Sequence, residues 1–426
     1  MKRPHQRKRF AASRLPAPHL TIAFIPVNIS LIALLLQAPL AAQNTDLTTP
    51  GSCLEQENAK AYFMLGGFFY EQEEYDKAIE NFSQSIKLAP DLASCYTARG
   101  LAYYSKDQHD KAIEDFNQAL HLDPESALTY VARGSAYLEK MEHAKAIESY
   151  SEGMRLDPDY ANTYLLRGIA YTYGGDYDKA INDLGQAIIR IPNDGDPYHC
   201  RGRAYIGKEE FDKAIADLSI AGSLKPEDPA IWHCRGEAHL HKEEFDKAIE
   251  DFSKCIELGG ETASAHVNRA IAYQEENAFD KAIADFNKAI GLGENDMWLY
   301  RNRGNAHFEK ADYDQAIEDY TSALARCEME DRRSLYDKRG KAYEATGEDD
   351  RAIEDYSRAK RLSSRPDYRP EYELLEKRCR TLVEDGEYEM ALELDPALVS
   401  QLLSRGAGID KAVEDLDLAL SLNPDY

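Results

Sequence analysis

Histidine and carboxylate side chains gather on one predicted helix in the middle of the chain. His233, Glu237 and His241 follow one another at intervals of four residues, which places them on one helix face. His199 and Arg203 would come from the preceding helix of the same kind. Imidazole nitrogens and a carboxylate are ligands that Zn²⁺ accepts, so one hypothesis is a metal-binding protein that uses these three residues and His199. The alternatives are a polar contact to a bound partner and a duplicated polar wall without a role.

Other signatures of catalysis or cofactor binding are missing from the sequence. It contains no phosphate-binding Walker loop, no dinucleotide glycine fingerprint, no His-Glu-x-x-His and no Cys-x-x-Cys. Its glycines stand at a fixed phase, as packing residues do, and the periodic region described next leaves no length for an enzymatic domain. The sequence therefore predicts no enzymatic activity and no cofactor.

The elements that carry these side chains repeat along the chain. The stretch from Tyr75 to Phe82 returns as His109 to Phe116. The alanine of this stretch recurs every 34 residues, and two extra residues are inserted before its last occurrence. Each repeat carries a small residue twelve positions before that alanine: Gly66, Gly100, Gly134, Gly168, Gly202, Gly236, Ala270, Gly304 and Gly340. A proline closes most repeats: Pro90, Pro124, Pro158, Pro192 and Pro226.

This pattern resembles the tetratricopeptide repeat (TPR) over residues 59–366, as nine repeats. The resemblance implies an all-α fold, a right-handed superhelical solenoid of stacked helix-turn-helix repeats of 34 residues with a concave groove. In residues 93–126 we expect one helix from Ser94 to Lys106 and a second from Asp110 to Leu122. Residues 367–426 are predicted to form two divergent or truncated repeats, which is common at the ends of such arrays.

The resemblance also implies that the first helix of each repeat lines the groove, where members of the family hold protein segments. We therefore predict a non-catalytic scaffold that binds a protein or peptide in this groove. The groove lining is expected to be apolar in the N-terminal repeats and polar in the middle repeats, which would suit a peptide or an amphipathic helix. The predicted lining is Leu101, Tyr104, Val131, Leu138, Leu165, Ile169, His199, Arg203, His233, Glu237 and His241.

An arginine precedes the small residue in eight repeats, and an acid follows sixteen residues later in seven of them. Repeat three has Arg133 but Ser149, and repeat one has neither, with Leu65 and Asn81 instead. Pairing each arginine with the acid of its own repeat leaves only Arg133 without a carboxylate. We therefore interpret the series as ion pairs between the two helices of a repeat, rather than as a basic ladder that binds a ligand.

The charge of the chain is strongly negative, with 51 Lys and Arg against 76 Asp and Glu and a formal net charge of −25. Residues 1–42 hold six basic residues and no acid, so the remainder is more acidic still. Such a body repels nucleic acid and anionic lipid, and we expect no nucleic-acid partner.

The N-terminus is typical of an export signal. Its basic residues precede an apolar run from Leu20 to Leu36, and small residues follow at Ala38, Ala41 and Ala42. Three interpretations stay open for residues 1–42: a cleaved signal peptide, an uncleaved anchor and a cytosolic protein. The first places the repeats in the periplasm or outside the cell. The second makes the protein a membrane-anchored assembly factor for an envelope complex, with residues 20–42 as its only membrane contact. Residues 43–58 are predicted to be a linker.

Seven cysteines are an odd number for an oxidising compartment. Cys200 and Cys234 occupy equivalent positions in neighbouring repeats, about 8–10 Å apart if their helices pack side by side. That separation is too long for a disulfide, and we expect no disulfide framework.

Overall fold

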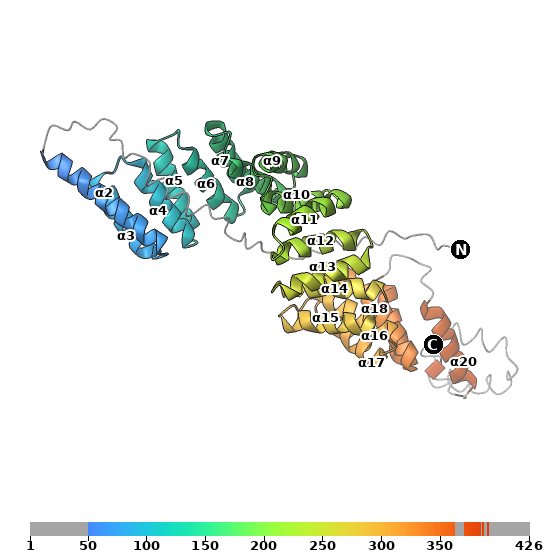
Figure 1. Cartoon of the computed structure of the whole chain (residues 1–426). Helices are drawn as coiled ribbons and strands as arrows, with labels where there is room; N and C mark the ends of the chain where they lie inside the picture. Colours follow the sequence, from blue (N-terminus) through green and yellow to red (C-terminus); the bar gives the residue numbers. More distant parts are fainter. Residues whose placement is uncertain (1–49, 363–369, 385, 387–389, 392–426) are drawn as a thin grey trace. The chain divides into compact units, whose positions relative to one another are not determined.

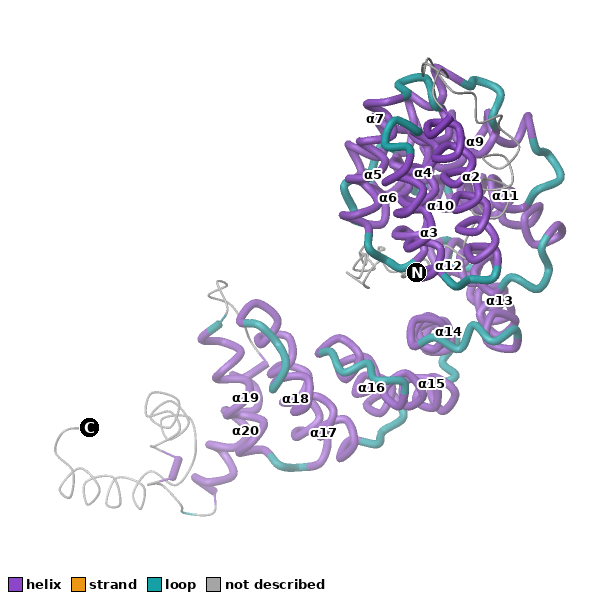
Figure 2. The backbone as a smooth tube through the Cα atoms, turned by 90° about the vertical axis from the view of Figure 1, so that its left-hand side faces the viewer, coloured by secondary structure: helices purple, strands orange, loops and turns teal. Residues whose placement is uncertain are grey.

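The computed structural model describes residues 50–362, 370–384, 386 and 390–391. Every regular element in these ranges is a helix, and eighteen of the nineteen helices pair in consecutive helix-turn-helix units (Figure 2). The predicted all-α repeat architecture is therefore confirmed. Residues 1–49, with the predicted signal segment and the start of the linker, lie outside the described residues, as do 392–426.

The chain divides after Gly260 into two compact bodies, and each is described here by itself. The first body holds six helix pairs (Figure 1): α2 (Pro50–Glu71) with α3 (Tyr75–Leu88), α4 (Ala93–Ser105) with α5 (His109–Leu122), α6 (Ala127–Glu139) with α7 (His143–Leu156), α8 (Ala161–Tyr173) with α9 (Tyr177–Arg190), α10 (Gly195–Gly207) with α11 (Phe211–Leu224), and α12 (Pro229–His241) with α13 (Phe245–Glu257).

The second body continues the pairing and ends in a single described helix (Figure 1). Its helices are α14 (Ala263–Glu275) with α15 (Phe279–Gly291), α16 (Met297–Glu309) with α17 (Tyr313–Leu324), α18 (Met329–Thr346) with α19 (Asp349–Arg361), and α20 (Pro370–Glu384). The long helix α18 accommodates the two-residue insertion, because it has 18 residues where the other first helices of this body have 13.

Helix boundaries agree with the prediction for residues 93–126 within one residue at each end. One boundary does not agree. The sequence predicts a linker over residues 43–58, but α2 begins at Pro50, so residues 50–58 belong to the first helix. Pro50 and Gly51 are typical of a loop, but proline is also well tolerated in the first turn of a helix.

Each repeat closes around a contact between its small residue and a large side chain sixteen positions later. A Cβ added to Gly100 would lie 2.7 Å from the ring of Phe116, and one added to Gly168 would lie 2.6 Å from Leu184 Cγ. Both Phe116 and Leu184 are fully buried. Glycine therefore stands here because the backbone of the first helix touches a core side chain of the second helix.

The second helices of the first seven repeats end in two different ways. In the first five repeats a proline follows the last helical residue by two positions, as Pro124 follows Leu122. Repeats six and seven lack this proline and use glycine in the left-handed region, Gly259 at φ 85° and Gly293 at φ 102°. Glycine adopts this conformation without steric cost, so it ends the helix as effectively. The boundary between the two bodies falls beside Gly259.

The predicted arginine–aspartate pairing within repeats is confirmed seven times. Arg99, for example, donates from Nε and Nη2 to the two carboxylate oxygens of Asp115, both at 2.8 Å. Each aspartate is buried, so the series is part of the fold rather than a ligand ladder. The other pairs are Arg167–Asp183, Arg201–Asp217, Arg235–Asp251, Arg269–Asp285, Arg303–Asp319 and Arg339–Asp355.

The same guanidinium groups also link neighbouring repeats, which the sequence did not reveal. Nη1 of Arg99 donates to Ser83 Oγ at 3.1 Å, on the second helix of the preceding repeat. Arg133, whose own repeat offers only Ser149 at 3.2 Å, reaches back to Asn117 at 2.9 Å. These bonds to the preceding repeat all use neutral acceptors in Arg99 and Arg133. One side chain joins three helices.

Candidate functional site

The first helices of the first body lie side by side and form one continuous face. Contacts run from α2 to α4, α4 to α6, α6 to α8, α8 to α10 and α10 to α12. We call the surface of these six helices the first-helix face. All eleven predicted lining residues belong to α4, α6, α8, α10 or α12, so the structure places them on consecutive elements of this surface.

Five of the six residues predicted as the apolar lining are not accessible. The exposed fractions are 2% for Leu101 and Val131, 6% for Leu138 and Ile169, and 1% for Leu165. The expectation of exposed apolar contacts is wrong for these five, because each side chain lies in the packing between stacked helices. They determine the spacing of the face and do not present an apolar surface. Tyr104 alone among the six is partly exposed.

Tyr104 forms a contact across two repeats. Its hydroxyl donates to Glu139 Oε1 at 3.5 Å, and its ring lies 5.5 Å from the ring of His109. Burial raises the pKa of Tyr104, and the nearby carboxylate of Glu139 adds to this effect. The hydroxyl is therefore neutral at all ordinary pH values and acts as a hydrogen-bond donor.

His199 and Cys234 come together from α10 and α12. The distance from His199 Nε2 to Cys234 Sγ is 3.5 Å, and both side chains are buried. Burial, and then the positive charge of Arg203, lowers the pKa of His199 to about 3. Burial raises the pKa of the Cys234 thiol to about 12. Both groups are thus neutral, and neither has the character of a nucleophile or a base.

Arg203 lies beside this pair on α10, in a half-buried position. Its guanidinium is 5.7 Å from the centre of the Tyr173 ring, which belongs to α8. No ion pair between Arg203 and a carboxylate is found in the described part of the chain, although acids outnumber bases so heavily in this protein. Arg203 does not belong to the repeated arginine series, in which seven of eight members are paired with aspartate, and it is a separate feature of the first-helix face.

The proposed metal ligands do not converge. The ring of His233 packs edge-on against Phe252 at 5.6 Å, and the ring of His241 stacks on Phe211 at 4.9 Å. Within the described ranges, no group of three or more His, Cys, Asp or Glu side chains could hold a metal ion. The hypothesis of a metal site at His233, Glu237, His241 and His199 is therefore wrong. Helical spacing placed them on one helix face, but aromatic neighbours from the second helices hold both imidazoles.

Residues that the sequence analysis missed are Tyr173 and His143. Their rings stack at 5.9 Å with an interplanar angle of 10°, and Tyr173 also contacts Arg203. A sequence signal for Tyr173 was present, because Leu165, Ile169 and Tyr173 follow one another at intervals of four residues on one helix.

The six cysteines in the described ranges are free, and five of them are buried. No helix in those ranges is both long enough and apolar enough to span a bilayer.

Three family models match the chain, and together they cover more than half of it. They describe a TPR repeat (residues 68–107 and 100–141) and two forms of the tetratricopeptide repeat (residues 201–260 and 301–366, and residues 127–160 and 263–296). No match was found among curated proteins.

Several solved structures are similar to this chain. A tetratricopeptide repeat protein from Parabacteroides merdae shares 17% identity at a TM-score of 0.49, over 59% of this chain and 99% of its own. MamA from Desulfovibrio magneticus shares 21% identity at a TM-score of 0.38, and the match covers 40% of this chain and 96% of MamA. YrrB, a TPR protein with an unusual peptide-binding site, shares 19% identity at a TM-score of 0.39, and the match covers 43% of this chain and 95% of YrrB. The matched family models, together with the helix pairs, show that the chain belongs to the tetratricopeptide repeat family.

Proposed function

We propose that this protein is a non-catalytic scaffold that holds a segment of a protein partner on its first-helix face. Repeat proteins of this family generally bind proteins or peptides. The observation that carries the proposal is Arg203, a half-buried cation without a carboxylate partner in the described residues, next to Tyr173. A partly desolvated arginine gains most from a carboxylate, so the bound segment would present an acidic side chain or its C-terminus to Arg203.

Other residues of the first-helix face support a polar and aromatic contact surface rather than the apolar groove of the sequence-based prediction. Tyr104, Glu237 and His241 are partly exposed on the same face. Tyrosine and arginine are the side chains that contribute most at protein interfaces, because they combine large contact area with directed hydrogen bonds. The buried residues Leu165 and Ile169 would keep this surface in shape without touching the partner.

Site-specific photo-cross-linking tests the proposal. A photoreactive phenylalanine analogue would replace Tyr104 or His241 on the first-helix face. The control position is Ile189 on α9, which is 71% exposed. Cross-linking in cells of the source organism should capture the same partner from Tyr104 and from His241, and not from Ile189. A partner captured only from Ile189, or captured equally from all three, would place binding elsewhere on the array.

We further propose that the array is exported, either released after cleavage within residues 1–42 or held at the membrane by residues 20–42 as an assembly factor. The apolar run from Leu20 to Leu36 after a basic start supports this proposal. The mass of the mature protein distinguishes the two forms, since cleavage removes about forty residues. Recovery of the intact chain in the soluble cytosolic fraction would contradict both.

A further inference from the structure

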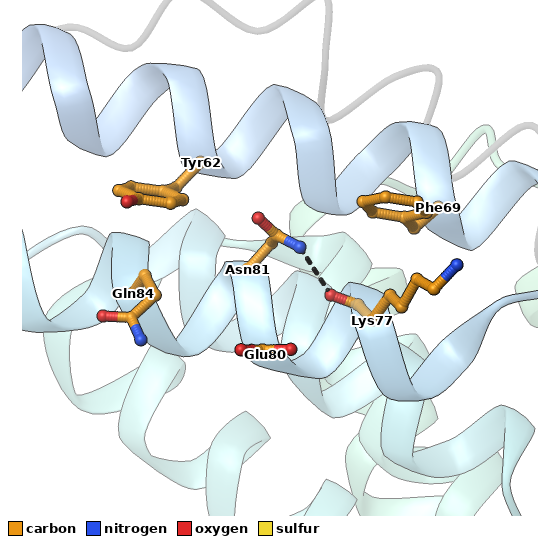
Figure 3. A pocket seen from close by; sticks show the side chains of 6 residues that line it. All are labelled: Tyr62, Phe69, Lys77, Glu80, Asn81 and Gln84. Atoms are coloured by element: carbon orange, nitrogen blue, oxygen red, sulfur yellow. Dashed lines mark hydrogen bonds between the residues drawn. The ribbon is translucent and has the colours of Figure 1, made fainter.

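The first repeat contains a pocket that is lined by both of its helices. Two aromatic rings of α2, Tyr62 and Phe69, line it together with side chains from α3. Figure 3 shows the two rings projecting from α2 with the Asn81 amide between them in this view. The full lining is Tyr62, Phe69, Lys77, Glu80, Asn81 and Gln84.

The same place in the second repeat is filled by an arginine. Its lining positions are those of the pocket shifted by 34 residues, with Tyr96 for Tyr62 and Tyr103 for Phe69. The guanidinium of Arg99 lies 5.8 Å from the Tyr96 ring and 5.9 Å from the Tyr103 ring. It is fixed by two hydrogen bonds to Asp115, the counterpart of Asn81.

Repeats five and nine show the same sandwich. Arg201 lies 6.0 Å from each of its two tyrosine rings. Arg339 lies 5.8 and 5.7 Å from its own two rings. A guanidinium between two aromatic rings is stabilised by attraction to both ring faces. The array thus shows repeatedly which group this kind of pocket accepts.

The first repeat lacks the arginine but keeps the walls of its site. Leu65 takes the arginine position, is 43% exposed and does not line the pocket. Asn81 replaces the aspartate, and its Nδ2 donates to the Lys77 carbonyl oxygen at 2.8 Å. Its Oδ1 remains a hydrogen-bond acceptor of the kind a guanidinium needs.

We infer that this pocket binds the guanidinium of an arginine side chain from a protein partner. The incoming group would lie between Tyr62 and Phe69 and donate a hydrogen bond to Asn81 Oδ1. The negative charge of the protein, −25, favours a partner with arginine on its surface. Phe68, 53% exposed with its ring 5.7 Å from that of Phe69, adds apolar contact beside the pocket.

Lys77 does not exclude a second cation, although its Nζ lies 5.1 Å from the centre of the Phe69 ring. In the second repeat, Lys111 lies 5.3 Å from the Tyr103 ring that also contacts Arg99. One ring therefore accepts a lysine and an arginine at the same time. Lys77 is in addition paired with Glu74, which offsets its charge. The pocket belongs to the edge of the array and is independent of the contact proposed at Arg203.

The test uses N-acetyl-argininamide as the probe, in the full-length protein, and the side-chain amide resonance of Gln84 as the signal, because Gln84 lines the pocket and is kept in every variant. We expect a saturable NMR shift with a millimolar Kd. The neutral isostere N-acetyl-citrullinamide should give no saturable shift, because it lacks the charge. Asn81→Asp should tighten probe binding about tenfold, because a carboxylate forms stronger, charge-assisted hydrogen bonds with a guanidinium.

The blocking variant combines Leu65→Arg with Asn81→Asp, which rebuilds the arrangement of the second repeat. It should fold as well as the wild type and lose probe binding, because its own arginine occupies the pocket. Asn81→Lys provides a second block by charge. A citrulline shift equal to that of arginine would overturn the inference, and so would the absence of a saturable arginine shift or a probe affinity unchanged in both blocking variants.

Discussion

Arg201 and Asp217 join the two helices of repeat five through a bidentate ion pair, with Nε–Oδ2 at 2.6 Å and Nη2–Oδ1 at 2.8 Å. The aspartate is 5% exposed, and the guanidinium lies against Tyr198 and Tyr205. A buried pair of this kind adds little net stability while it is intact. Loss of one partner is costly because the other charge stays buried.

Arg201→Leu is therefore expected to destabilise the first body by about 3–5 kcal/mol, since the Asp217 carboxylate would be left without its partner. The matched control is Arg133→Leu, whose partners Ser149 and Asn117 are neutral, with an expected loss of about 1 kcal/mol. Urea denaturation followed by circular dichroism measures both. Equal effects of the two substitutions, or no change for Arg201→Leu, would refute the role of the pair.

Gly100→Ala is expected to destabilise the array by about 1–3 kcal/mol, because the new methyl group would lie 2.7 Å from the Phe116 ring. The control is Gly291→Ala, at a helical position with open space around it. Gly291 is the last residue of α15, so alanine there should leave stability nearly unchanged, because the added methyl group meets no neighbour. Thermal melts give the sign of each effect. A neutral Gly100→Ala would show that the helices separate without cost.

Ala311→Gly is expected to raise the melting temperature of the second body. Ala311 connects α16 to α17 with φ 63°, a left-handed conformation that costs a residue with a Cβ roughly 1–2 kcal/mol. Glycine removes this conformational cost in the folded state. Part of the resulting gain in stability is offset, because glycine also gives the unfolded chain more conformational freedom. The reverse substitution at the equivalent position of repeat four, Gly175→Ala at φ 79°, should lower stability. Differential scanning calorimetry compares the two, and a lower melting temperature for Ala311→Gly would contradict the strain argument.

The pKa of His199 predicts a pH dependence of stability. Burial depresses its folded-state pKa to about 3, whereas an unfolded histidine titrates near 6.5. Between these values the unfolded chain binds the extra proton, so stability falls as the pH is lowered through this window. Between pH 7.5 and pH 5.0 this group should account for a loss of about 2 kcal/mol.

Denaturation at those two pH values measures the loss in the wild type and in His199→Gln, which cannot take up the proton. The groups around the imidazole are Arg203, Lys225, His233 and Cys234. The exposed His121→Gln serves as the control and should retain the full dependence. An unchanged dependence in His199→Gln would show that the imidazole is not held neutral by the fold.

The repeat and its pairing could be predicted from the sequence because they depend on local spacing. Sixteen residues separate Arg99 from Asp115, and the 34-residue period fixes which helix faces which. The second role of Arg99, its bond to Ser83, was not predictable because serine at that position has no distinctive charge. The start of α2 was missed because a proline can begin a helix as well as interrupt one.

The candidate site was harder to predict because exposure depends on how closely neighbouring repeats stack. Leu165 and Ile169 share a helix face with Tyr173, and their spacing in the sequence predicts the same orientation for all three side chains. In the structure the two aliphatic side chains are covered, while the tyrosine remains partly exposed beside Arg203. The helical pattern therefore identified the face correctly and the accessible residues only in part.

Arg203 is proposed to receive a carboxylate from the bound segment. The most direct test of this proposal is the affinity of the segment captured by photo-cross-linking, measured by calorimetry for the wild type, Arg203→Gln and the second-helix control Lys247→Gln. We predict binding at least about tenfold weaker for Arg203→Gln and unchanged for Lys247→Gln. Equal affinity for all three proteins, each shown to be folded, would contradict the claim and remove Arg203 from the binding surface.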